Sequence, residues 1–152
     1  MSWDSSRLVT SGDGTAIAVH TLGTGPDLIV LGGALQAAVD YLGLAQLLGD
    51  GFTVHVPDRR GRGGSGPHGE NYSLDREVDD LLAVRSATAA RMVFGHSYGG
   101  LVVLETMARG TDFAAASVFW LCKATAAGCS CVRVGALPKI SSSSAPIATV
   151  SW

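Results

Sequence analysis

The feature that most limits what this chain can fold into is a serine enclosed by glycines at residues 95–99, which read Gly-His-Ser-Tyr-Gly. The apolar stretch 91–94 before it is typical of a short strand, and residues 101–109 have the pattern of a helix. Glycines at both flanks of such a turn let the strand and the helix pass closely. The sequence therefore predicts a strand–turn–helix unit that exposes Ser97.

This setting suits a nucleophile. A serine hydroxyl is a weak nucleophile. It therefore needs a base that takes its proton and backbone N–H groups that stabilise the developing oxyanion. The amino end of the helix behind Ser97 favours negative charge. Gly95, His96 and Gly99 are interpreted as structural parts of the turn. The alternative is a turn without any chemical role.

The remaining pattern of the first 113 residues alternates strands and helices. An Asp-Gly step at 13–14 predicts a hairpin, and a glycine-rich loop covers 58–69. Ser73 is expected to cap a helix whose first turns are rich in acidic residues. We expect an α/β fold, with a mostly parallel sheet, helices on both faces and an N-terminal β-hairpin. The expected strands are 7–10, 16–21, 28–31, 52–56 and 91–94, and the expected helices are about 36–48, 76–82 and 101–109.

A second motif lies upstream of the serine. Residues 58–65 read Asp-Arg-Arg-Gly-Arg-Gly-Gly-Ser and match the pattern D-x-R-G-x-G-x-S. With this loop and the nucleophile turn in the right order, the chain resembles the α/β-hydrolase superfamily, in its serine-nucleophile branch. That group includes carboxylesterases, cofactor-free haloperoxidases, proline iminopeptidases and lactone hydrolases. The likeness covers about residues 7–113 and implies a truncated α/β-hydrolase fold, its amino-terminal half.

The resemblance implies roles for individual residues. Ser97 would be the catalytic nucleophile, and the backbone N–H groups of Ala34 and Tyr98 would form the oxyanion hole. Gly32 stands where the family usually has a histidine, and a shift of one residue would make Leu35 the donor instead of Ala34. A serine at this position argues against the dehalogenase and epoxide hydrolase branches, which use an aspartate. The implied reaction is acyl transfer from an ester-like or amide-like small molecule, without cofactor or metal.

Two members of the family's catalytic triad have no candidate at the expected place. In the family the acid and then the histidine follow the nucleophile, but no histidine follows His96 and no carboxylate follows Asp112. His20 and His55 fall within expected strands, which leaves the loop residue His68 as a base that could approach Ser97. We therefore expect a catalytically incomplete hydrolase. The alternative is a non-catalytic fragment or pseudoenzyme, with a binding role or no independent role.

Composition divides the chain at about residue 113. Residues 1–113 hold all 13 acidic residues, whereas 114–152 hold three basic residues and no acidic one. We interpret 1–113 as a partial hydrolase domain and 114–152 as an atypical tail, within which 114–121 could form a makeshift sixth strand. Three accounts of the tail fit: a natural flexible or disordered segment, a divergent carboxy-terminal half, or translation in another frame, which we favour.

Several other functions fit poorly. A net charge of −2 gives no broad field for nucleic acid or an anionic membrane, and the start of the chain lacks the pattern of a secretory signal. A cytoplasmic protein with a small-molecule substrate is expected, and the oligomeric state stays open.

Cys122, Cys129 and Cys131 form neither a disulfide framework nor a zinc site of four ligands. Residues 61–66 match G-x-G-x-x-G but do not open a helix, unlike a dinucleotide fingerprint.

Overall fold

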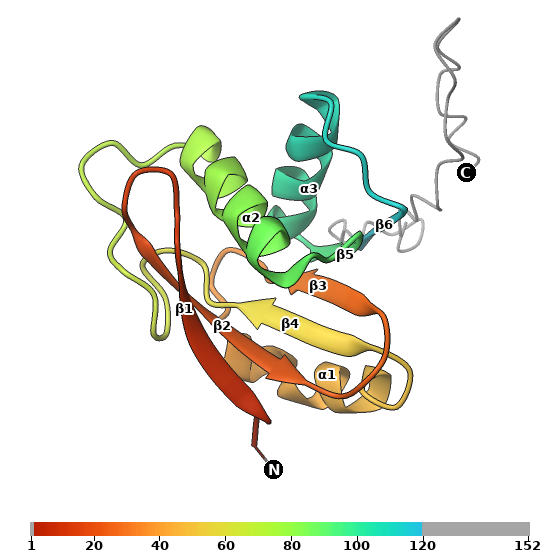
Figure 1. Ribbon diagram of the computed structural model, residues 1–152. Helices are drawn as coiled ribbons and strands as arrows, with labels where there is room; N and C mark the ends of the chain where they lie inside the picture. The colour runs from red at the N-terminus through yellow and green to blue at the C-terminus, as the bar shows by residue number, and fades with distance from the viewer. Residues whose placement is uncertain (1, 120–152) are drawn as a thin grey trace, which may run out of the picture.

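The computed structural model describes residues 2–119, which form one six-stranded mixed sheet with helices on both faces (Figure 1). The strands lie in the order β1-β2-β4-β3-β5-β6. This architecture confirms the α/β fold class expected from the sequence. The elements, in chain order, are β1 (Ser5–Thr10), β2 (Ala16–Leu22), β3 (Asp27–Leu31), the 3₁₀ helix η1 (Ala38–Tyr41), α1 (Leu42–Leu48), β4 (Thr53–Pro57), α2 (Leu74–Thr88), β5 (Met92–His96), α3 (Tyr98–Ala108) and β6 (Ala115–Phe119).

The predicted hairpin is present at one edge of the sheet. Strands β1 and β2 are antiparallel, with Arg7 opposite Val19, and the amide of Ser11 donates to the carbonyl of Thr15 across the turn, at 2.8 Å. Gly14 has a φ of +86°, which a residue without a Cβ adopts at little cost. Strand β2 is also antiparallel to β4, whereas β4, β3, β5 and β6 are mutually parallel.

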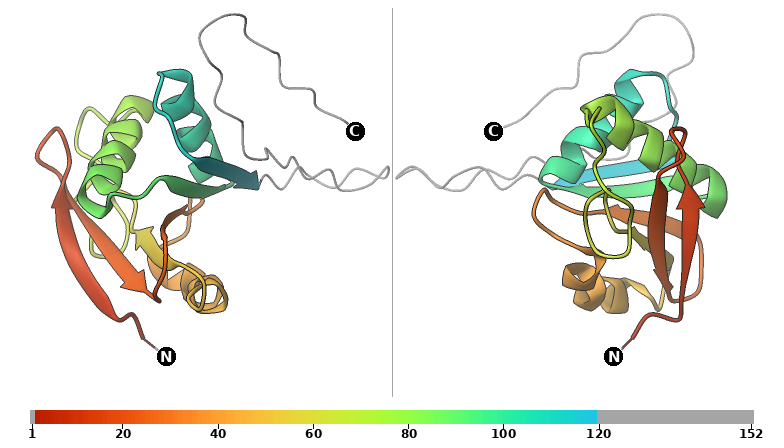
Figure 2. Two further views of the ribbon diagram at one scale, coloured as in Figure 1. Left: turned by 45° about the vertical axis from the view of Figure 1, so that its right-hand side comes forward. Right: turned by 90° about the vertical axis from the view of Figure 1, so that its left-hand side faces the viewer.

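The central strand β3 has an apolar face on each side because helices cover both faces of the sheet. Helix α1 lies on one face, and α2 and α3 lie on the other (Figures 1 and 2). Ile29 packs in the core beneath α2 and α3, and its neighbour Val30 packs in the core beneath α1. Both are fully buried. The continuous apolar run of this strand is explained by the double cover.

Two predicted helices begin differently from the expectation. The segment expected at 36–48 starts as η1 and becomes α-helical only at Leu42, and the Ala38 amide there is held by the Asp58 carboxylate at 2.7 Å. Ser73 does occupy the position before α2, but within residues 2–119 its side chain makes no capping hydrogen bond. The expectation of a Ser73 cap bond was therefore wrong.

The sheet continues past residue 113. Strand β6 pairs in parallel with β5, with Phe94 opposite Ser117 and His96 opposite Phe119, so the suggested sixth strand is confirmed at 115–119. The interpretation of residues 120–152, with the three cysteines, concerns a segment outside the described residues. Between residues 2 and 119 no helix is long and apolar enough to cross a membrane.

Candidate active site

Ser97 lies in the tight turn between β5 and α3. Its backbone adopts φ +52° and ψ −120°, a conformation that costs a residue with a side chain about 1–3 kcal/mol. The flanking glycines explain how the turn closes. A Cβ on Gly95 would lie 2.7 Å from the Cα of Gly100, and a Cβ on Gly99 would lie 2.6 Å from the carbonyl oxygen of Gly32. The predicted strand–turn–helix unit is confirmed, and the role of Ser97 as a nucleophile stays a prediction.

The loop after β3 meets this turn. A Cβ placed on Gly33 would lie only 3.4 Å from the Cβ of Ser97. On the other side, the amide of Ser97 donates to the carbonyl of Phe119 in β6, at 2.8 Å. The serine side chain is half-buried, and no hydrogen-bond partner for its hydroxyl lies within the described part of the chain. The two segments that the family resemblance implies for the oxyanion hole are therefore brought to the same place.

The proposed oxyanion donors belong to these two segments. Tyr98 is the first residue of α3, so its N–H has no acceptor within the helix. Ala34 is exposed and follows Gly33 in the loop. Among residues 2–119, neither N–H group is paired with a carbonyl or a side-chain oxygen. Leu35, the alternative donor, is also in this loop and its side chain is 88% exposed. The assignment of the donors stays a prediction.

Three of the four histidines have partners of their own. His20 Nε2 contacts Asp58 at 2.9 Å, and His55 Nε2 contacts Asp27 at 2.8 Å. His96 Nδ1 lies 2.7 Å from the hydroxyl of Tyr41, which fits the expected structural role. These contacts use a ring nitrogen of each of the three histidines for a partner other than Ser97.

His68, the remaining candidate base, packs on another aromatic ring. Its ring centroid lies 4.6 Å from that of Tyr72, and the same ring occupies the space that a Cβ on Gly61 would need. Within residues 2–119 no histidine is hydrogen-bonded to Ser97. In the same range no three metal-ligating side chains form a group that could hold a metal ion.

The glycine-rich loop 58–66 is closed upon itself. The Gly61 amide donates to the carbonyl of Gly66 at 2.7 Å, and the hydroxyl of Ser65 donates to the carbonyl of Asp58 at 2.6 Å. Other amides of the loop bond to β2, such as that of Gly66 to the carbonyl of Ala16 at 2.7 Å, and α2 does not begin until Leu74. A dinucleotide fingerprint presents its amides at the start of a helix. Residues 61–66 therefore do not open a helix, as the sequence predicted.

Asp58 anchors the loop to its surroundings. Burial by itself would raise the pKa of this carboxyl, but the hydrogen bonds from the amides of Ala38 and Gly64 and from His20 outweigh burial and lower the pKa. One oxygen receives the Ala38 amide at 2.7 Å and the other receives the Gly64 amide at 2.9 Å. The carboxylate therefore ties the loop after β4 to the loop after β3.

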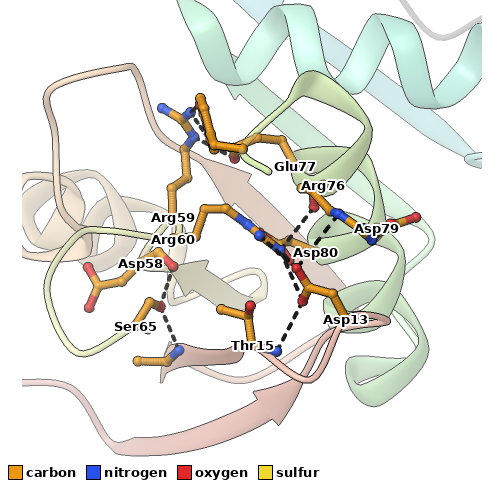
Figure 3. Close-up of polar contacts among 12 residues, drawn as sticks. Asp13, Thr15, Asp58, Arg59, Arg60, Ser65, Arg76, Glu77, Asp79 and Asp80 are labelled. Carbon is orange, nitrogen blue, oxygen red and sulfur yellow. Dashed lines mark hydrogen bonds and ion pairs between the residues drawn. The ribbon is translucent and has the colours of Figure 1, made fainter. Parts of the chain in front are cut away.

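Two buried arginines follow Asp58 and point to different carboxylates of α2 (Figure 3). Arg59 forms a two-point pair with Glu77, at 2.9 Å and 2.5 Å. Arg60 pairs with Asp80 at 2.7 Å for both contacts, and with Asp13 in the hairpin turn at 2.9 Å. The hydrogen bond from Arg60 lowers the pKa of Asp13, and that with Asp80 raises the pKa of Arg60.

Sequence reasoning missed these ion pairs. It attributed the acidic residues of α2 to the positive end of the helix, whereas Glu77 is 2% exposed and Asp80 is 6% exposed. A partial signal was present, because residues three apart share one face of a helix and two consecutive arginines stand in the loop just after β4. Their burial depends on how α2 packs on the sheet.

Comparisons with known proteins agree with the geometry. The family model described as "Alpha/beta hydrolase family" matches residues 17–149. The chain belongs to the alpha/beta hydrolase family. The resemblance noted in the sequence is thereby confirmed, as is the fold.

Individual members of the family differ in the reactions that they are named for. Over 95 residues the chain is 39% identical to a pimeloyl-[acyl-carrier protein] methyl ester esterase of Chromobacterium violaceum, an alignment that covers 62% of this chain and 36% of the esterase. An alpha/beta hydrolase of Sphaerobacter thermophilus superposes with a TM-score of 0.71 at 39% identity, over 74% of this chain and 44% of that one. Epoxide hydrolase A of Mycobacterium thermoresistibile superposes with a TM-score of 0.68 at 26% identity, over 77% and 39%. The chain spans less than half the length of these relatives.

Proposed function

We propose that this chain carries the nucleophile half of a serine hydrolase site that acts on an ester-like or amide-like small molecule. The observation that carries the proposal is the strained backbone of Ser97, at φ +52°, between β5 and α3. Strain of this size persists only where the surroundings impose it, and it gathers at functional sites. The esterase among the relatives is consistent with this reaction class.

In the proposed reaction Ser97 Oγ bonds to the carbonyl carbon of the substrate as its hydroxyl proton passes to a base. The carbonyl oxygen becomes an oxyanion, which the N–H groups of Ala34 and Tyr98 would stabilise. Collapse of this intermediate breaks the bond to the alcohol or amine, which leaves with a proton. Water then releases the acid from the acyl-serine. No cofactor takes part in these steps.

Among the described residues, this site lacks a base that contacts Ser97. None of the described histidines is bonded to Ser97, and removing triad members from a serine enzyme costs several orders of magnitude in rate. We therefore propose that the chain by itself is catalytically incomplete and turns over slowly. His68 would have to leave its contact with Tyr72 to serve as the base.

The test is covalent labelling of the full chain with a fluorophosphonate probe. We expect labelling of the wild type that Ser97→Ala abolishes and that Ser86→Ala, an exposed serine on α2, leaves unchanged. A short-chain nitrophenyl ester assay on the same three proteins measures turnover. Equal labelling of the wild type and Ser97→Ala would contradict an activated serine.

The second candidate is a non-catalytic fragment or pseudoenzyme. It is favoured by the contacts that occupy His20, His55 and His96. On this reading the turn survives as a packing element, and the probe would label no serine above background. The labelling experiment therefore separates the two candidates.

A further inference from the structure

The guanidinium of Arg59 lies between the two segments that would form the oxyanion hole. Its Nη1 donates to the carbonyl oxygen of Gly33, at 3.1 Å. Its Cζ also lies 4.4 Å from the centroid of the Tyr98 ring, within the range of a cation–π contact. One side chain thus touches the loop after β3 and the residue after the nucleophile.

This guanidinium is held firmly. Glu77 receives two of its N–H groups, and the exposed fractions of the Arg59 and Glu77 side chains are 6% and 1%. The hydroxyl of Tyr72 completes the cluster by donating to Glu77 at 2.9 Å. Burial alone would lower the pKa of Arg59, but its hydrogen bond and charge interaction with Glu77 outweigh burial and raise that pKa. Arg59 therefore remains charged, and the pair fixes it in place (Figure 3).

The contact with Gly33 sets the direction of a specific N–H group. The carbonyl of Gly33 and the N–H of Ala34 belong to the same peptide unit, which is planar and trans. In such a unit the C=O and N–H bonds point in opposite directions. Because Arg59 holds the oxygen, the Ala34 N–H must point away from the buried ion pair. A charged donor on the oxygen also polarises the unit and strengthens its N–H as a donor.

The loop needs this restraint because glycine is its pivot. Gly33 has no Cβ to limit rotation of its backbone, and it lies beside Ser97. The peptide before Gly33 is fixed separately, since the Gly33 amide donates to the hydroxyl of Tyr41 at 2.9 Å. The carbonyl oxygen of the peptide after Gly33 accepts from Arg59 at 3.1 Å and, at the longer distance of 3.4 Å, from the amide of Gln36, so Arg59 is its nearer and charged donor. Each side of the pivot thus has its own buried side chain.

We propose that Arg59 and Glu77 form a positioning pair that locks the Gly33–Ala34 peptide so that the Ala34 N–H serves as an oxyanion donor. This inference rests on the proposed function of Ser97. The pair touches neither substrate nor reacting atoms in this account. It acts through the peptide and through its contact with the Tyr98 ring.

Arg60 provides a matched control. It is also buried and bound to two points of an α2 carboxylate, but its partners are Asp80 and Asp13 rather than the oxyanion segments. Replacing both members of a buried ion pair by apolar residues is often neutral for stability. The double variants Arg59→Met/Glu77→Leu and Arg60→Met/Asp80→Leu therefore remove comparable pairs while each keeps an apolar core.

The first measurement is the N–H residual dipolar coupling of Ala34, recorded by NMR on the full ¹⁵N-labelled chain. This coupling reports the orientation of that bond. We expect it to change in Arg59→Met/Glu77→Leu and to match the wild type in Arg60→Met/Asp80→Leu. An unchanged coupling in the first variant overturns the inference, whatever its labelling rate.

The second measurement is the second-order rate constant for labelling of Ser97 by the fluorophosphonate, per folded molecule. The loss of one oxyanion donor lowers the rate about 10²–10³-fold. Because the Arg59→Met/Glu77→Leu variant misplaces the Ala34 N–H without deleting it, we expect a smaller fall, of about 10- to 100-fold. The control should stay within about twofold, because the hydrogen-bond partners of Arg60 are Asp80, Asp13 and the carbonyl of Arg76, none of which belongs to the oxyanion segments. A labelling rate equal to that of the wild type in the first variant also overturns the inference.

The two measurements separate this inference from the proposed function. If the wild type is labelled no faster than Ser97→Ala, the proposed function fails, and the Ala34 coupling still decides whether the pair sets the peptide. If Arg59→Met/Glu77→Leu does not fold, Arg59→Lys replaces it as the site variant. Lysine cannot donate to Gly33 and to both Glu77 oxygens with a fixed fork, so we expect a changed coupling there too, and an unchanged one overturns the inference.

Discussion

Arg59 and Arg60 are neighbours in the chain, yet they stabilise two different regions of the molecule. Arg59 belongs to a site region, with Glu77, Gly33 and the nucleophile turn. Arg60 belongs to a hairpin region, where it joins α2 to the turn between β1 and β2 through Asp80 and Asp13. Both are buried charges in two-point pairs. The two pairs differ in what they reach, because only Arg59 also contacts a backbone group of the candidate site. We therefore expect only the Arg59 pair to affect the labelling of Ser97.

Removing one partner in the hairpin region should give the largest effect on stability. Arg60→Met leaves Asp80 buried without its partner, and breaking a buried pair costs about 3–5 kcal/mol. We expect a lower free energy of unfolding by that amount in urea titrations, with the labelling rate of the folded fraction unchanged. A slower rate in the folded fraction would show that the two regions are coupled.

Crowding the nucleophile turn should harm the site region next. In Gly99→Ala, the new Cβ would meet the carbonyl oxygen of Gly32 at 2.6 Å, and overpacking of this kind costs about 1–3 kcal/mol. We expect reduced stability and also slower labelling, because the turn must shift. Thermal unfolding and probe kinetics on the same sample measure both. Wild-type labelling kinetics would contradict the tight fit of this turn.

Acid should weaken the fold through carboxyls whose pKa is lowered, with Asp13 as the one in the hairpin region. The pKa of Asp13 is lowered chiefly by its hydrogen bond with Arg60, and hydrogen bonds also lower that of Asp58. A lowered pKa in the folded state stabilises the fold above the unfolded value, about 3.9, and this stabilisation is lost as the pH falls through the folded pKa. We expect the free energy of unfolding to decline below about pH 4, and to decline less steeply in Asp13→Asn. Parallel slopes for the two proteins would contradict this role of Asp13.

The smallest effect should come from replacing Arg62. This variant distinguishes between Ala34 and Leu35 as the oxyanion donor in the loop after β3. This partly exposed arginine donates to the carbonyl of Ala34 at 3.0 Å, and that oxygen shares its peptide with the N–H of Leu35. If Ala34 is the donor, Arg62→Met should slow labelling by about twofold, as expected for a weak surface contact. A fall as large as that of the Arg59 double variant would favour Leu35.

Much of this fold could be predicted because it depends on local pattern. The apolar run of β3 and the glycines around Ser97 reflect constraints that act within a few residues. The split between η1 and α1 could not be predicted, since it involves a hydrogen bond from Ala38 to Asp58, 20 positions away.

The candidate site divides in the same way. Ser97 was found from its turn, whereas the partner of Arg59 could not be read from the sequence. Which acidic residue of α2 meets which arginine is set by how the helix lies on the sheet. The sequence placed those acidic residues at the positive end of a helix, a local rule that burial overrides here.

The central claim is that Ser97 is the nucleophile of an incomplete hydrolase site, and the most direct test is to map the fluorophosphonate adduct. The full chain is labelled, digested and analysed by mass spectrometry beside Ser97→Ala and Ser86→Ala. We predict one adduct on the peptide that contains Ser97, lost only in Ser97→Ala. An adduct spread over other serines, or none above background, would contradict the account.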